Sequence, residues 1–538
     1  MGDRIEPKRT ASDDTTKAEV DNGVGDVSFG ASRAQLRKYH WAFYLTNFGI
    51  GPAFSSHIIY MSFQIQQNAF WSVGHHPGQP PRTGCPNLGQ PCRVPLGTSD
   101  VNLTSLLLYI NAIGFGVGGF VTLFVCAWGD HMRLKREQYI LLVCMYGALC
   151  LPAAGLTAYN ISNYYGLISL YIIFAVVGYL VIAWGNIFVP YAMQAAAPIE
   201  DLPARARLDA LNSIDGDERR ALRARREEEG LKISVGGSVS LNIAMVLFSV
   251  ITIGISYATM DARKNAGMYM TTVSGVVCIL CALAGWRFLP SPQPTAHNGN
   301  WWLLPFTVFG SLWKGISRYT NAMLFLFAYA IYNDSHFAFS AVIGQLFNLN
   351  IRPSIREYTA YSVAGSITSV IGSVAFMYVF PHSRLSLRQW AMVAFGLAIF
   401  TAFWCCLGMS KHVAIGFKHR AEFYVFQVVM SLAGAILNPL YRVLFPQMFP
   451  KGNEIQYFGF QLVLSCATAW IPQVVNGPIV DKTNNQRLPA AIALAFFFVS
   501  LGLTWWCDDV GGVSIIHKEE VEALEKEAAV VERAIPSA

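Results

Sequence analysis

The sequence predicts an all-α, polytopic membrane protein with twelve transmembrane helices in two halves of six. Only 13% of its 538 residues are charged and 53% are hydrophobic, whereas soluble domains carry about 25% charged residues. Long apolar windows recur along the chain, each close to the ~20 residues that a helix needs to cross the hydrocarbon core. These windows lack the strict alternation of a membrane-spanning strand. Water is therefore not the solvent for most of the surface.

Twelve such windows follow one another, and they are rich in Leu, Ile, Ala and Gly. They cover residues 41–65, 103–128, 138–158, 165–190, 235–258, 267–289, 322–347, 357–380, 390–409, 422–444, 457–480 and 488–507. The residues before the first window lack the basic and then apolar pattern of a cleaved signal peptide. We therefore expect the first helix to direct insertion and to remain in the protein.

The Lys and Arg residues predict the orientation, because positively charged loops resist translocation. The two tails and the loops on their side hold 28 of the 39 Lys and Arg residues, and the loops on the other side hold 11. None is expected in the interior of a helix. Both termini are therefore expected in the cytosol, with the polar loop 69–100 on the opposite side of the membrane.

The windows divide into two groups of six, which is typical of transporters built from two parallel repeats around a central site. The predicted parts are a cytosolic polar tail (1–38), an N-terminal half (39–290) with a charged cytosolic loop at 195–234, a cytosolic linker (291–321), a C-terminal half (322–507) and a charged cytosolic tail (508–538). The dense charges at 199–232 are interpreted as a solvated linker or a frayed helix. Residues 517–533 are interpreted as a short charged helix.

The short loop after the second window contains an acid followed by spaced basic residues. This pattern resembles the loop signature between helices 2 and 3 of the major facilitator superfamily. Asp130 facing Arg133 or Arg136 would form a latch that closes the cytosolic side in one state and releases it in another. The alternative interpretation is an ordinary basic turn that only sets the orientation.

The polar loop 69–100 contains two cysteines, Cys85 and Cys92, on the side of the membrane where disulfides persist. We predict a bridge between them, with free thiols as the alternative. Asn102 and Asn160 begin glycosylation sequons on the same side. Both lie next to the end of a predicted helix, which leaves little room for modification.

Asp334 is the only acidic residue that falls in the middle of a predicted helix. Ionisable groups at membrane depth are costly, and they tend to face a cavity and to serve transport. His336 follows two residues later, and His57 is central in the first window, which is pseudo-equivalent to the seventh. We therefore predict that Asp334 is a protonation site or a counter-charge for a cation, assisted by His57 or His336. The alternative is a structural Asp in a broken helix.

Amides and aromatic residues within the windows are candidates for orienting a substrate, although each also fits a role in holding helices together. These candidates are Asn47, Asn111, Trp184, Asn186, Asn242, Asn333, Asn438 and Gln461. The chain lacks a phosphate-binding Gly-x4-Gly-Lys-Ser/Thr loop, which disfavours an ATP-driven pump. We expect no enzyme activity, cofactor, metal site or nucleic-acid partner.

Three segments near the C-terminus carry a resemblance to a known family. They read MFPKGNEIQYFGF at 448–460, ATAWIP at 467–472 and DKTNNQR at 481–487. These segments are similar to the helix 10–12 region of the autophagy-related protein 22 family, and Tyr332-Asn333-Asp334 resembles the tyrosine-x-aspartate of its seventh helix. That family comprises fungal vacuolar amino-acid effluxers within the major facilitator superfamily.

The resemblance implies a secondary transporter that exports neutral or branched amino acids from the vacuole lumen to the cytosol and supports nutrient recycling after autophagy. We expect a monomer in the vacuole membrane whose partners are amino acids, protons and the lipid bilayer. Other interpretations stay open. They are efflux of a secondary metabolite or toxin by the same fold, a non-transporting receptor or scaffold, and a location in the plasma membrane.

Overall fold

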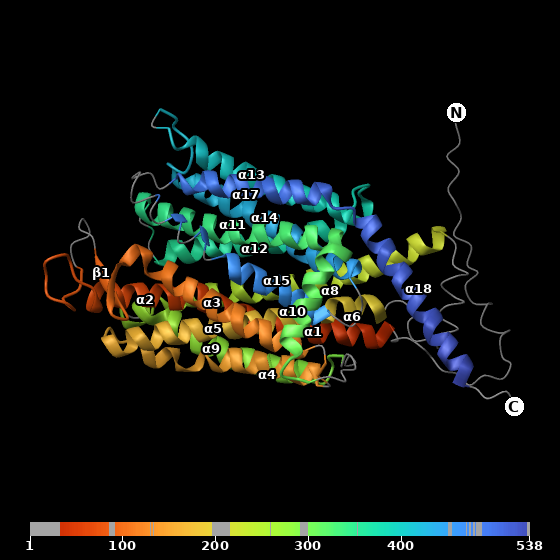
Figure 1. Cartoon of the computed structure of the whole chain (residues 1–538). Coiled ribbons are helices and arrows are strands. Elements are labelled where there is room, and N and C mark those ends of the chain that lie inside the picture. Colours follow the sequence, from red (N-terminus) through yellow and green to blue (C-terminus); the bar gives the residue numbers. More distant parts are fainter. Residues whose placement is uncertain are drawn as a thin grey trace, which may run out of the picture.

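The computed structural model describes residues 33–534 except for 86–91, 130, 133, 196–215, 259, 291–299, 352, 354, 411, 450–453, 470, 473–474, 477–478 and 480–486. The described chain is a bundle of long helices with one short hairpin (Figure 1). The hairpin pairs β1 (Arg93–Leu96) with β2 (Ser99–Asn102) in antiparallel register.

The helices of the N-terminal half precede residue 290. They are α1 (Arg33–Ser55), η1 (Ser56–Met61), α2 (Ser62–Asn68), η2 (Ala69–Val73), α3 (Leu103–Gly129), α4 (Lys135–Ala148), η3 (Leu151–Leu156), α5 (Ile161–Asn186), α6 (Phe188–Ala195), α8 (Gly216–Ile255) and α9 (Met260–Trp286). Helix α1 packs against both α8 and α9, α3 packs against α5, and α4 packs against α9. The segment from α1 to η2 is helical throughout, so the first window lies within one continuous helical segment.

The C-terminal half follows a linker that contains the helix α10 (Leu304–Arg318). Its helices are α11 (Thr320–Asn350), α12 (Ile355–Val379), η5 (Phe380–His382), α13 (Leu387–Leu407), α14 (Arg420–Leu444), η6 (Phe445–Met448), α15 (Glu454–Thr468), α17 (Pro489–Trp506) and α18 (Asp509–Ala534). Helix α11 packs against α17, α12 against α14, and α13 against both α14 and α17.

The two ends of the bundle differ in what they carry. Figure 1 shows the start of α1 and helix α18 at one end and the β1–β2 hairpin at the other. We call these the α18 end and the hairpin end. The described chain therefore begins and finishes at the same end of the bundle, as an even number of crossings requires.

Within the described residues, nine helices are long and apolar enough to cross a membrane. The helical membrane fold is thus confirmed, while the count of twelve stays a prediction. The windows 41–65, 322–347 and 457–480 coincide with helical segments that are not among the nine. Helix α11 includes the polar run Asn333-Asp334-Ser335-His336. A helix that faces protein on most sides tolerates such residues, because neighbouring helices replace the lipid contact.

The charged stretch before the fifth window is helical from Gly216 onward, as the first part of α8 rather than a loop. Arg223 pairs with Glu227 at 2.8 Å, and Lys232 pairs with Glu228 at 2.8 Å. Both pairs have the i,i+4 spacing that stabilises a helix. The charged C-terminal tail is also helical over a longer range than expected, because α18 begins at residue 509 rather than 517.

The most extensive contacts between the halves are those of α3 with α15 and of α8 with α12, and α8 also contacts α14 while α5 contacts α15. Glycines allow the first pair to approach closely. A Cβ at Gly119 would lie 2.7 Å from the Cβ of Cys466, and one at Gly459 would lie 2.5 Å from the Cβ of Cys126. Small residues at such crossings permit backbone contact that larger side chains would prevent.

Candidate functional site

Asp334 lies near the middle of α11, where this helix meets α15. Its side chain is 6% exposed, and its Oδ2 accepts a hydrogen bond from the Thr468 hydroxyl at the end of α15. Its Oδ1 is buried without a hydrogen-bond partner among the described residues. Helix α15 in turn packs against α3 and α5 of the N-terminal half. Asp334 therefore lies at the junction of the two halves, with one carboxylate oxygen left for a ligand or a proton.

His336 does not lie beside Asp334. The two side chains are two residues apart on one helix, and they therefore point to different faces. The His336 ring stacks on Tyr332, with 5.8 Å between centroids. Tyr332 in turn contacts Phe395 of α13 and Phe497 of α17. This face of α11 thus packs into the C-terminal half.

His57 lies in η1 and packs into the N-terminal half. Its Nε2 lies 3.1 Å from the carbonyl oxygen of Tyr171, and its ring stacks on Phe174 with 4.7 Å between centroids. This is the environment of a buried core histidine. In the part of the chain that the structure describes, neither histidine contacts Asp334.

Two predicted amides, Asn333 and Asn438, come together on facing helices. The Tyr329 hydroxyl of α11 donates a hydrogen bond to Asn438 Oδ1 at 3.0 Å, and it also bonds to Asn333 one turn along its own helix. The Tyr329 ring stacks on Tyr441 of α14, with 3.7 Å between centroids and 5° between planes. Tyr329 thus positions two amides at the contact of α11 and α14, and an amide oxygen can accept a second bond from a ligand.

Arg442 lies one turn beyond Asn438, in the last turn of α14 and not in a loop. The expected placement of all Lys and Arg residues in loops is therefore wrong for Arg442, as it is for Arg223 in α8 and Arg356 in α12. Tyr139 of α4 and Tyr329 of α11, one from each half, lie within electrostatic range of the Arg442 guanidinium. Among the described residues, no carboxylate lies within ion-pair distance of it. In the sequence, an arginine near a helix end cannot be distinguished from the loop cations that set the orientation in the membrane. Sequence analysis therefore missed Arg442.

Helix α5 supplies two tyrosines that sequence analysis also missed. The Tyr171 hydroxyl donates to Asn111 Oδ1 of α3 at 3.0 Å. A Cβ at Gly118 of α3 would lie 2.6 Å from the Tyr179 ring. The two tyrosines are about two turns apart on one face of α5. That spacing was the signal available in the sequence, and it places both rings against α3.

The remaining amide and tryptophan candidates make contacts within their own half. Asn47 and Asn242 each donate to a carbonyl one turn back in their own helices. Gln461 donates to a serine one turn further along α15. Trp184 and Asn186 are buried near the end of α5. These contacts fit a packing role for Asn47, Asn242 and Gln461.

The predicted cytosolic latch lies partly outside the described residues, because these exclude Asp130 and Arg133. Arg136 is described, and its Nη2 lies 2.6 Å from Glu137 Oε1. Its Nη1 donates to the carbonyl oxygen of Leu289 at 3.4 Å. The latch stays a prediction.

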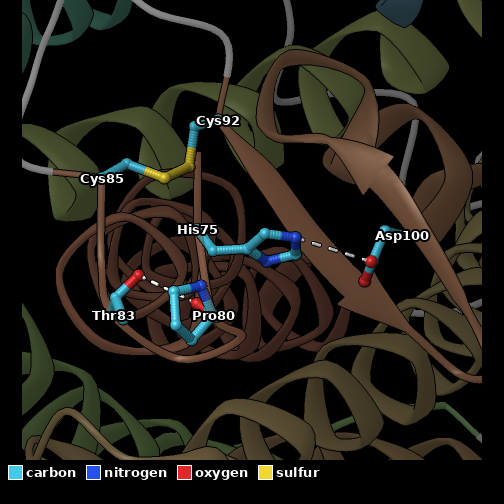
Figure 2. Close-up of a disulfide and its surroundings, with 6 residues drawn as sticks. All are labelled: His75, Pro80, Thr83, Cys85, Cys92 and Asp100. Atoms are coloured by element: carbon cyan, nitrogen blue, oxygen red, sulfur yellow. Dashed lines mark hydrogen bonds and ion pairs between the residues drawn. A yellow bond between two sulfur atoms is a disulfide. The ribbon is translucent and has the colours of Figure 1, made fainter. Parts of the chain in front are cut away.

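The hairpin end is cross-linked. Figure 2 shows the disulfide between Cys85 and Cys92, with an S–S distance of 2.04 Å. Beside it, His75 Nε2 lies 3.7 Å from Asp100 Oδ2 of β2. The bridge therefore closes the loop that leads from η2 into the hairpin.

Both predicted sequons lie close to helix starts at this end. Asn102 is the exposed last residue of β2. Asn160 is the N-cap of α5, and its Oδ1 accepts a bond from the backbone N–H of Asn163 at 2.7 Å. Glycosylation of either residue stays a prediction.

The groups at the junction of the halves are binding groups. They comprise one carboxylate, one guanidinium, two amides and several tyrosine hydroxyls. Among the described residues, no three His, Cys, Asp or Glu side chains are grouped so as to hold a metal ion.

The chain matches the family described as "Vacuole effluxer Atg22 like" over residues 35–513. Autophagy-related protein 22 of Candida albicans is 27% identical over 466 residues, which cover 86% of this chain and 87% of that protein. Autophagy-related protein 22 of Kluyveromyces lactis is 23% identical over 199 residues, which cover 36% of this chain and 40% of that protein.

Two solved structures have a similar fold. A human organic anion transporter, MFSD10 (TETRAN), has a TM-score of 0.55 and 11% identity, covering 87% of this chain and 99% of its own. The major facilitator superfamily transporter FucP has a TM-score of 0.52 and 14% identity, covering 88% and 98%. Members of this family and these neighbours are transporters and not enzymes. The chain therefore belongs to the vacuole effluxer Atg22-like family, and it is a multi-pass membrane transporter with the major facilitator fold.

Proposed function

We propose that this protein is a secondary transporter in the vacuole membrane that exports neutral or branched amino acids to the cytosol after autophagy. The observation that carries the proposal is Arg442, a guanidinium between tyrosines of the two halves with no acidic partner among the described residues. The family description as a vacuole effluxer supports the location and the direction. In this orientation the α18 end faces the cytosol.

Each part of an amino acid finds a suitable group in this region. A guanidinium binds a carboxylate through two parallel charged hydrogen bonds. The amide oxygens of Asn333 and Asn438 can accept from an ammonium group, and the stacked rings of Tyr329 and Tyr441 offer an apolar surface. A charged substrate side chain would need a further partner, and α11 contains no Asp, Glu, Lys or Arg besides Asp334. This composition favours neutral substrates.

Asp334 is proposed as the proton carrier. Its bond to Thr468 links α11 to α15, and α15 packs on α3 of the other half. Loading or losing a proton on Asp334 changes the charge beside α15, whose contact with α3 must separate for alternating access. An acidic lumen would load the proton and a neutral cytosol would release it together with the amino acid.

The test is uptake of labelled leucine into proteoliposomes that contain the purified full-length protein, with lysine, glutamate and organic anions as further substrates. Organic anions are included because Arg442 would also suit them, and the human structural neighbour is named for that class. We expect saturable leucine uptake driven by a pH gradient, and a raised content of neutral amino acids in vacuoles that lack the protein. Absence of transport of every amino acid, with unchanged vacuolar content, would overturn the proposal.

A further inference from the structure

A pocket lies at the hairpin end, away from Arg442. It is lined by residues of the first helix, α8 and α9 of the N-terminal half and by α12 of the C-terminal half. Its polar lining includes Tyr60, Gln64, Thr252, Ser256, Arg356 and Thr359. Helix α8 finishes and α12 starts at this end, so the pocket spans the α8–α12 contact between the halves.

Arg356 is the cation of this hairpin-end pocket. Its guanidinium carbon lies 3.6 Å from the centroid of the Tyr257 ring, and its Nη2 donates to the Ser256 carbonyl oxygen at 3.3 Å. Its Nε is buried without a hydrogen-bond partner among the described residues. The adjacent Glu357 pairs with Arg420 instead, at 3.0 Å. The positive charge of Arg356 is thus held by a ring and a carbonyl, with no ion pair to a described carboxylate.

The rest of the lining indicates what kind of anion fits. Gln64 is 2% exposed, and its Nε2 donates to the Thr157 carbonyl oxygen at 3.0 Å, which leaves its Oε1 as an acceptor. Phe63, Ile253 and Met268 form the apolar part of the wall. An inorganic anion would leave this apolar wall without a contact. A small carboxylate with an aliphatic side chain would match both parts.

We propose that the hairpin-end pocket is a capture site for small aliphatic carboxylates, with Arg356 binding the carboxylate group. The inference rests on the proposed function only in identifying the bound carboxylate as a neutral amino acid. Because Arg356 belongs to α12 and Ser256 follows α8, the site is complete only while the halves are closed at this end. Occupancy therefore stabilises closure at the hairpin end.

The test uses the full-length protein with Ile253→Cys in the pocket wall, and follows alkylation of that cysteine by a maleimide through mass spectrometry of its peptide. The probes are isovalerate, which has the carboxylate and no amine, and leucinamide, which has the amine and no carboxylate. At a concentration about ten times its Kd or higher, isovalerate should slow alkylation by roughly tenfold or more, because the cysteine reacts only while the pocket is empty. Leucinamide should have no such effect.

Three variants in this background locate the binding group. Arg356→Gln should abolish protection by isovalerate. Arg420→Gln, at the same end but 62% exposed in its side chain, and Arg442→Gln, at the other end, should both retain protection. Equal protection by the two probes would overturn the inference even if Arg356→Gln does not fold. Persistence of protection in Arg356→Gln, or its loss in Arg442→Gln, would overturn it as well.

The pocket and the proposed function can fail separately. Carboxylate protection without transport of any amino acid would refute the proposed function and keep the capture site. Leucine transport without protection at the pocket would refute the capture site and keep the proposed function.

Discussion

Replacing Arg442 by Gln should weaken amino-acid binding and leave the fold intact. Hydrogen bonds to a charged group contribute about 1.5–3 kcal/mol, which corresponds to a roughly 10- to 150-fold rise in KM. Removing one member of a buried ion pair destabilises a protein because it leaves the other charge unpaired. Arg442 has no such ion-pair partner among the described residues, and the side chains within electrostatic range of it are those of Tyr139 and Tyr329. The free energy of unfolding should therefore change by less than about 1 kcal/mol.

The assay is counterflow of labelled leucine in proteoliposomes, because exchange reports binding without a requirement for proton coupling. Arg420→Gln is the matched control on the same helix. Its partner Glu357 lies 3.0 Å away at the surface, where an ion pair contributes about 0–1 kcal/mol. Arg442→Gln should raise KM for leucine while Arg420→Gln leaves it unchanged. A KM for leucine in Arg442→Gln equal to that of the control would show that the carboxylate is bound elsewhere.

Three further perturbations address coupling, gating and stability. Asp334→Asn keeps the hydrogen bond from Thr468 but cannot bind and release a proton. Net efflux driven by a pH gradient should therefore disappear while leucine counterflow persists. If the variant retains net efflux at normal abundance, Asp334 has a structural role. Gly459→Leu should hold α15 away from α3, because even a Cβ there would meet Cys126 at 2.5 Å. Overpacking costs about 1–3 kcal/mol, so alkylation of Cys126 should accelerate, whereas Gly502→Leu, with open space around it, should leave that rate unchanged. Cys85→Ser removes the disulfide between Cys85 and Cys92. The unfolded chain then gains conformational entropy, which lowers the free energy of unfolding by about 2.5 kcal/mol. Protease resistance of the hairpin end should fall, and adding Cys92→Ser should lower it no further; a larger fall in the double variant would indicate a separate role for the second thiol.

Sequence analysis found Asp334 and the amides Asn333 and Asn438 of the candidate site, and it missed Arg442 for a physical reason. A carboxylate in the middle of an apolar window is costly wherever the helix packs, so Asp334 could be recognised from its position alone. An arginine near the end of a window costs little free energy if its guanidinium reaches water. Only the tertiary structure shows that tyrosines of both halves, Tyr139 of α4 and Tyr329 of α11, lie within electrostatic range of Arg442. The same limit explains the histidines, since His57 and His336 occupy pseudo-equivalent helices but pack into separate cores.

The sequence by itself determined that this chain is a helical membrane protein, because each crossing segment must be apolar over its own length, and that requirement is met or failed locally. It also carried the family resemblance in short contiguous motifs. Which polar side chains meet between the halves was decided only in the tertiary structure. Successive residues turn by about 100° around a helix, so the partners of Asp334, Arg442 and Arg356 depend on how each helix is rotated. That rotation is fixed by close contacts between distant segments, such as Gly459 against Cys126, which no local window contains.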